Sequence, residues 1–143
     1  MKFKFILAAL ALSGPVMAQS SSLVQALIRV ESGGRANAIG DQGRALGILQ
    51  IHSGMVQEAN RIAGTRYVHR DMLDPVKARK VASIVLGHYS RHIQQTTGRP
   101  ATRKELAFIW NGGGEAWKRA SRPVADAKQA NLQRYWSRVA ASF

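Results

Sequence analysis

The chain has 143 residues, a formal net charge of +13 and no cysteine. This length holds one domain with a modest core, and the lack of cysteine excludes a disulfide scaffold and thiolate metal sites. So strong a positive charge indicates association with a polyanion and says nothing about the fold.

The N-terminal residues have the pattern of a signal peptide. A positive start and an apolar run over residues 5–12 precede a small-x-small ending at Val16 and Ala18. The apolar run is far shorter than the roughly 20 residues that span a bilayer, so we expect no stable membrane insertion. We predict a signal peptide over 1–18 and one folded domain over 19–143, located in the periplasm or cell envelope or secreted. Loss of two lysines would lower the net charge to +11.

A helix is predicted from Ser22 to the glycine pair at 33–34. Ser22 and Gln25 have the spacing of a capping box, and apolar residues then recur with helical periodicity. Glu31 lies in the last turn, where the helix dipole favours cations. A carboxyl beside an apolar face is partly desolvated, which raises its pKa and suits a general acid. The alternative is a surface glutamate paired with Arg29 or Arg35.

The segment after this helix is rich in glycine and polar residues, and it predicts a loop with at most a short hairpin around 36–51. Its apolar part, residues 45–51, contains one amide, Gln50. An amide in an apolar stretch must find partners, so Gln50 is either a structural hydrogen-bond hub or a ligand contact.

The rest of the chain predicts helices with clear boundaries and almost no alternating strand pattern. The predicted helices cover residues 53–62, 74–98, 102–112 and the region around 132–139. Tyr135 and Trp136 fall at helical spacing and are predicted to be core residues. His88 and His92 have a spacing that can hold zinc, but no glutamate lies between them, so we expect no metal. The fold class is therefore mainly α.

Residues 110–114 combine an aromatic, an amide and three glycines. Trp110 and Asn111 are residue types found in sugar sites, and the glycines let another molecule approach the backbone closely. The alternative is a helix C-cap in which Asn111 and Gly112 adopt left-handed conformations.

Three segments together resemble the lytic transglycosylases and the goose-type lysozymes that share their fold. These families show Glu-Ser at a helix end, a Gly-Leu-Met-Gln-Ile-like stretch, and then Ala-Tyr-Asn-x-Gly. The matching residues here are Glu31-Ser32, 47–51 and 110–113, in the same order. The resemblance covers roughly residues 22 to 120.

The resemblance implies a lysozyme-like helical domain with Glu31 as the catalytic acid. It implies substrate-binding or supporting roles for Ser32, Gln50, Trp110, Asn111 and Gly112. Asp41 looks like the auxiliary aspartate of goose-type enzymes. His52 falls where those enzymes carry a second acid, which weakens the case for hydrolysis by two carboxylates.

The activity implied is cleavage of the β-1,4 bond between N-acetylmuramic acid and N-acetylglucosamine in peptidoglycan. With Glu31 as acid and then base, the product is a 1,6-anhydromuramyl end, and no cofactor is needed. One alternative is a goose-type-like muramidase that hydrolyses the same bond. The other is a cationic cell-wall or nucleic-acid binding protein without activity. We expect a monomer that binds glycan strands and anionic wall polymers; no nucleic-acid module is recognised.

Overall fold

The computed structural model describes the backbone of residues 15–143 and the side chains from residue 21 onward. Five α-helices are present in this part of the chain: α1 (Pro15–Ser32), α2 (Ser53–Ala63), α3 (Pro75–Thr97), α4 (Arg103–Gly112) and α5 (Ala127–Ala140). Strands β1 (Ile39–Gly40) and β2 (Ala45–Leu46) form an antiparallel hairpin. Three 3₁₀ helices complete the described chain: η1 (Asp41–Gly43), η2 (His69–Leu73) and η3 (Ala116–Arg119). The prediction of a mainly α domain with one small hairpin is confirmed.

The N-terminal helix differs from its prediction. It begins at Pro15, so Ser22 lies inside the helix and does not cap it. Proline is favoured at a first helical position, and no helix breaker follows it until the glycine pair. The predicted signal peptide falls mostly on residues 1–14, which lie outside the described part, and the predicted cleavage point after Ala18 falls within α1. Within the described residues, no helix has the length and apolarity needed to cross a bilayer.

The two central helices begin and end at the predicted signals. The side chain of Asp74 caps α3 by accepting hydrogen bonds from two backbone N–H groups, and Pro75 occupies the first turn. Gly98 ends α3 in a left-handed conformation. Thr102 and Glu105 form the predicted capping box of α4. Local residue types therefore set these boundaries.

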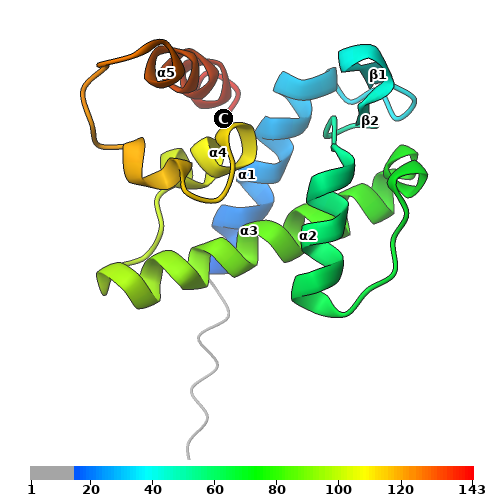
Figure 1. Ribbon diagram of the computed structural model, residues 1–143, viewed down its shortest axis with the longest axis horizontal. Helices are drawn as coiled ribbons and strands as arrows, with labels where there is room; N and C mark the ends of the chain where they lie inside the picture. The colour runs from blue at the N-terminus through cyan, green and yellow to red at the C-terminus, as the bar shows by residue number, and fades with distance from the viewer. Residues whose placement is uncertain (1–14) are drawn as a thin grey trace, which may run out of the picture.

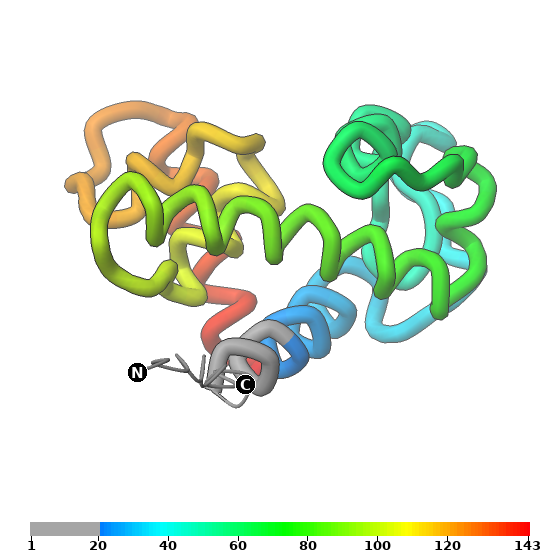
Figure 2. The backbone as a smooth tube through the Cα atoms, turned by 90° about the horizontal axis from the view of Figure 1, so that it is seen from below, coloured from blue at the N-terminus to red at the C-terminus, as the bar shows by residue number. Residues whose placement is uncertain are grey.

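Two lobes flank the long helix α3. The hairpin lobe comprises β1, η1, β2, α2 and η2, and the α4/α5 lobe comprises α4, η3 and α5. Figure 2 shows α3 running along both lobes, with the hairpin lobe near its start and the α4/α5 lobe near its end. Helix α1 contacts α3, α4 and α5, and its C-terminal end leads into the hairpin (Figure 1). The end of α1 therefore lies where the two lobes meet.

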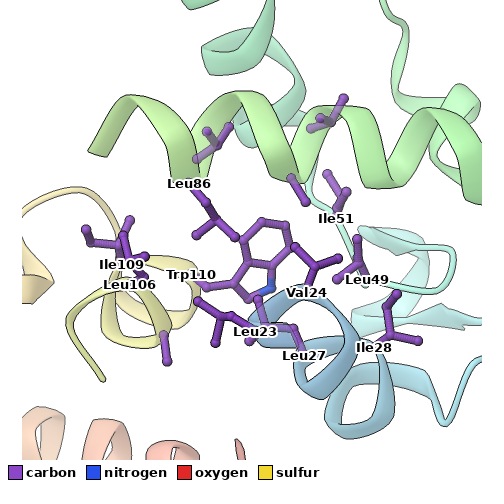
Figure 3. Close-up of a cluster of buried hydrophobic side chains, with 14 of the residues drawn as sticks. Leu23, Val24, Leu27, Ile28, Leu49, Ile51, Leu86, Leu106, Ile109 and Trp110 are labelled. Atoms are coloured by element: carbon purple, nitrogen blue, oxygen red, sulfur yellow. The ribbon is translucent and has the colours of Figure 1, made fainter. Parts of the chain in front are cut away.

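The main core lies between α1, α3 and α4, with the indole of Trp110 at its centre (Figure 3). Trp110 is only 7% exposed and is surrounded by leucines of all three helices, including Leu23, Leu86 and Leu106. Burying a large aromatic ring contributes several kilocalories per mole to stability and holds it in one position. The last turn of α4 is thereby fixed against the end of α1.

Candidate active site

A cleft of about 710 Å³ lies between the two lobes, above the C-terminal end of α1. Its floor is formed by residues of α1 and α3: Val30, Glu31, Val85 and Tyr89. The hairpin-lobe wall consists of Asp41, Ala45, Gln50, His52, Met55 and Glu58. The α4/α5 wall consists of Ile109, Trp110, Asn111, Gly113, Gly114 and Arg138. Six of the eight sequence-predicted site residues line this cleft; Ser32 and Gly112 do not.

The carboxyl group of Glu31 lies at the floor of the cleft, in the last turn of α1. Burial raises the pKa of this carboxyl above the usual 4.5. Three smaller effects lower the pKa and partly offset this rise: the hydrogen bond from Tyr135, the positive charge of Arg138 and a hydrogen bond from Trp110. The alternative pairing with Arg29 or Arg35 is not formed: neither is within ion-pair distance of Glu31, and Arg29 donates to the carbonyl oxygen of Ser142. This environment favours a carboxyl that can hold its proton and release it.

Tyr135 of α5 is the hydrogen-bond partner of this carboxyl. Its hydroxyl donates to Oε1 of Glu31 at 2.5 Å, across 104 residues of sequence. Burial, together with the neighbouring carboxylate, raises the pKa of the phenol, so Tyr135 keeps its proton and acts as a donor. Helical spacing predicts Tyr135 only as a core residue, and it is indeed buried. No local sequence pattern predicts its hydrogen bond to Glu31.

Gln50 is the hydrogen-bond hub of the hairpin lobe. Its amide nitrogen donates to the carbonyl oxygens of Ala38, at 3.2 Å, and Gly47, at 3.0 Å. Its backbone adopts a left-handed φ of 47°, which is uncommon for a residue with a side chain. Gly40 leaves room for the amide oxygen, since a Cβ there would lie 2.2 Å from it. Gln50 lines the cleft, but both of its N–H donors are committed to the hairpin backbone.

Ser32 ties the end of α1 to the segment that follows the hairpin. Its hydroxyl donates to the carbonyl oxygen of Ile48 at 2.8 Å and accepts from the backbone N–H of Gly34 at 3.1 Å. The side chain is only 5% exposed. Ser32 therefore holds the hairpin next to Glu31 without facing the cleft.

Asp41 and His52 lie together on the hairpin-lobe wall. An oxygen of Asp41 accepts from Arg44 at 2.6 Å, and its other oxygen lies 3.4 Å from Nε2 of His52. Asp41 and Gln42 both have left-handed φ values, 48° and 55°, in the tight turn of the hairpin. Strained backbone of this kind clusters at functional sites.

The segment after α4 forms the opposite wall. Asn111 is exposed and faces the cleft, whereas Trp110 is buried and presents no free ring face for a sugar. Gly112 packs near Leu132, and the cleft is lined instead by the next two glycines. A Cβ at Gly114 would lie 2.3 Å from the hydroxyl of Tyr89, so only glycine allows this approach.

Glu58 of α2 is a third carboxylate in the cleft, after Glu31 and Asp41, and the motifs do not indicate it. Arg61 donates to both of its oxygens, at 3.1 Å and 2.7 Å, and the hydroxyl of Tyr89 donates to one of them at 3.3 Å. The hydrogen bonds from Arg61 lower the pKa of Glu58, while burial raises the pKa of Glu31. With pKa values shifted in opposite directions, Glu31 is suited to donate a proton, whereas Glu58 stays negatively charged.

Comparison with known proteins agrees with this geometry. The family model described as the transglycosylase SLT domain matches residues 17–133, which is most of the chain. Searches of curated proteins and of solved structures found no match. Members of this family are peptidoglycan lytic transglycosylases with a lysozyme-like fold, so the chain is an enzyme and not merely a cationic binding protein. Its substrate is peptidoglycan of the cell envelope, and the chain belongs to the SLT family of lytic transglycosylases.

Proposed function

We propose that this enzyme cleaves the β-1,4 bond between N-acetylmuramic acid and N-acetylglucosamine and leaves a 1,6-anhydromuramyl end. Glu31 acts first as acid and then as base. The observation that carries the proposal is the position of this carboxyl, at the floor of a cleft, with its pKa raised by burial and one oxygen held by Tyr135.

The reaction needs a single proton carrier. The Glu31 carboxyl gives its proton to the glycosidic oxygen as the bond from that oxygen to C1 of the muramyl residue breaks. The oxygen of the substrate's 2-acetamido group bonds to C1 and carries the positive charge. The Glu31 carboxylate then takes the proton of the muramyl 6-hydroxyl, whose oxygen displaces the acetamido oxygen from C1. Glu31 is protonated again, and no water is consumed.

The other predicted site residues divide into contacts and supports. Asn111 and the backbone at Gly113 and Gly114 line the cleft and suit hydrogen bonding to sugar groups. Trp110 is buried in the core and supports the end of α4 beside the cleft rather than offering a stacking face. Gln50 and Ser32 hold the hairpin-lobe wall in place, because their hydrogen bonds go to backbone groups.

Hydrolysis would require a base that directs water to C1. Asp41 is the candidate for that base, and its two oxygens face Arg44 and His52. Glu58 has both oxygens occupied by Arg61. The hydrogen bonds from Arg61 lower the pKa of Glu58 and make it a weak base, and Asp41 is already bound by Arg44. The substrate's own 6-hydroxyl is therefore the nucleophile that we propose.

We further propose that residues 1–18 direct export and that the domain over 19–143 works as a monomer at the wall. The net charge of +11 that remains on residues 19–143 supports contact with anionic wall polymers, which screening by salt would weaken.

The test is cleavage of purified peptidoglycan by the wild-type enzyme and by Glu31→Gln, with mass spectrometry of the released fragments. The wild type should release ends lighter by one water than hydrolysed ends. Glu31→Gln should be slower by about 10²–10⁴-fold, the range of general acid–base catalysis. Glu115→Gln, which changes an exposed glutamate outside the cleft, serves as the control. Residual Glu31→Gln activity within about tenfold of wild type, a loss of only ~1.4 kcal/mol, would contradict the proposal.

A further inference from the structure

Arg138 of α5 differs from every other charged residue of the cleft. Among the described residues that line the cleft, it is the one lysine or arginine, and no carboxylate lies within ion-pair distance of its guanidinium. The carboxylates of Asp41 and Glu58 lie on the opposite wall, each with a basic partner of its own. The positive charge of Arg138 is therefore available to a ligand in the cleft.

The guanidinium is held close to the reacting centre. One nitrogen of Arg138 donates to the carbonyl oxygen of Val30 at 3.1 Å, and Val30 immediately precedes Glu31. The side chain is exposed, and a guanidinium has five N–H donors, so donors remain for a ligand after this bond. Figure 1 shows α5 on the other side of the α1 end from the hairpin. A group bound at Arg138 therefore lies against the α4/α5 wall beside Glu31.

The substrate contains two alternating β-1,4 bonds that a cleft must distinguish. Both sugars carry a 2-acetamido group, and only the muramyl residue carries a lactyl group, which ends in a carboxylate or continues as a peptide with carboxylates. A planar guanidinium binds a carboxylate through two parallel hydrogen bonds, which gives both energy and orientation. No neutral sugar group offers that geometry.

Given the proposed function, on which this inference rests, we propose that Arg138 is a specificity-determining residue that binds a carboxylate of the muramyl residue. The carboxylate belongs to the lactyl group itself or to the stem peptide attached to it. Binding at Arg138 places the muramyl residue so that its C1, and not that of N-acetylglucosamine, lies over Glu31. This contact therefore decides which of the two alternating β-1,4 bonds of the glycan strand is cleaved.

The test compares Arg138→Gln with wild type on matched glycan substrates. Strands stripped of peptide carry only lactyl carboxylates, whereas strands with peptides carry only peptide carboxylates. Each kind of strand is tested in two forms: with its carboxylates charged, and with them converted to neutral methylamides. For the wild type, neutralisation should lower kcat/KM by about tenfold, in line with a charge-assisted hydrogen-bonded pair. Arg138→Gln should lose about the same factor on the charged strands and should not respond to neutralisation. The kind of strand on which this pattern appears identifies the source of the carboxylate.

Controls separate this contact from other effects of the substitution. Arg134→Gln removes an exposed arginine of the same helix that does not line the cleft, and it should behave as wild type. Thermal unfolding of each variant checks that α5 stays docked, and Arg138→Lys, which keeps the charge without the planar fork, should recover part of the loss. If Arg138 acted only through its charge on Glu31, all strands would be affected equally, and that result would overturn the inference. The proposed function would stand even then, provided that wild-type enzyme released anhydro ends and Glu31→Gln did not.

Discussion

The two walls of the cleft handle their polar groups differently. On the hairpin-lobe wall, polar side chains are committed to that lobe: Gln50 bonds to backbone carbonyls, Asp41 lies between Arg44 and His52, and Glu58 is held by Arg61. On the α4/α5 side, Tyr135, Trp110 and Arg138 all act on the Glu31 carboxyl or on the backbone beside it. The polar groups of the hairpin-lobe wall stabilise that lobe, whereas those of the α4/α5 side act on the pKa and position of Glu31.

This difference separates two kinds of substitution. Substitutions on the hairpin-lobe wall should alter the stability of the protein but should not change the pH dependence of cleavage. Changes on the α4/α5 side should move the pH dependence, because the groups there act on the pKa of Glu31.

The largest loss of stability is expected for Gln50→Leu. The substitution removes the two side-chain hydrogen bonds, while the carbonyls of Ala38 and Gly47 keep their backbone partners, the N–H groups of residues 47 and 50. Loss of two hydrogen bonds should lower the free energy of unfolding by about 2 kcal/mol. Urea denaturation measures this change. The pH profile of the remaining activity should match that of wild type; a shifted profile would show that the hairpin lobe also sets the acid.

Tyr135→Phe tests the α4/α5 side. Loss of the hydroxyl removes a hydrogen bond that holds Glu31 in position, and activity near neutral pH should fall by about tenfold, the range of a hydrogen bond to a charged group. That hydrogen bond also lowers the pKa of Glu31, so its loss should move the basic limb of the pH–activity profile upward. An unchanged limb in a well-folded variant would contradict the role of Tyr135. Trp136→Phe, on the same helix outside the cleft, is the control.

Glu31→Gln should have a smaller, pH-dependent effect on stability. A carboxyl whose pKa is raised on folding binds its proton more tightly in the folded protein, so its contribution to stability falls as pH rises above the unfolded value near 4.5. Glutamine does not ionise. The variant should therefore melt close to wild type near pH 4 and above it near pH 7. A lower melting temperature at pH 7 than at pH 4, relative to wild type, would mean that the carboxylate is stabilised in the fold.

The smallest effect is expected for Asp41→Asn. If the substrate's 6-hydroxyl is the nucleophile, the variant should keep activity within about tenfold of wild type, because it removes no group of the proposed proton path. Mass spectrometry should still find anhydro ends. A large loss together with hydrolysed ends in the wild-type digest would instead assign Asp41 as the base for water.

The helix boundaries were predictable from local residue types. Asp74 before a proline, the pair Thr102 and Glu105, and Gly98 are short-range signals, and the structure follows them. The error at α1 has the same origin, since Ser22 fits a cap by spacing but the helix continues back to Pro15. A capping pattern marks a start only where the preceding residues leave the helix.

The site was predictable in part. Glu31, Gln50 and Asn111 carry motif signals, and the structure brings all three to one cleft. The choice between hub and ligand contact for Gln50 could not be made from sequence, because it depends on carbonyls at Ala38 and Gly47 whose direction the folded hairpin sets. Trp110 is a residue type found in sugar sites, but in the structure it is buried in the core.

The amino-acid sequence by itself determined a mainly α chain and placed one acid at the end of an apolar helix, since both follow from residues within a few turns of each other. Only the tertiary structure decided that Tyr135 and Arg138 meet that helix end, more than a hundred residues away. A tyrosine at helical spacing packs equally well with or without a carboxylate beside its hydroxyl. The docking of α5 on α1, and not any local pattern, therefore brings to Glu31 the two groups that partly offset the rise in its pKa caused by burial.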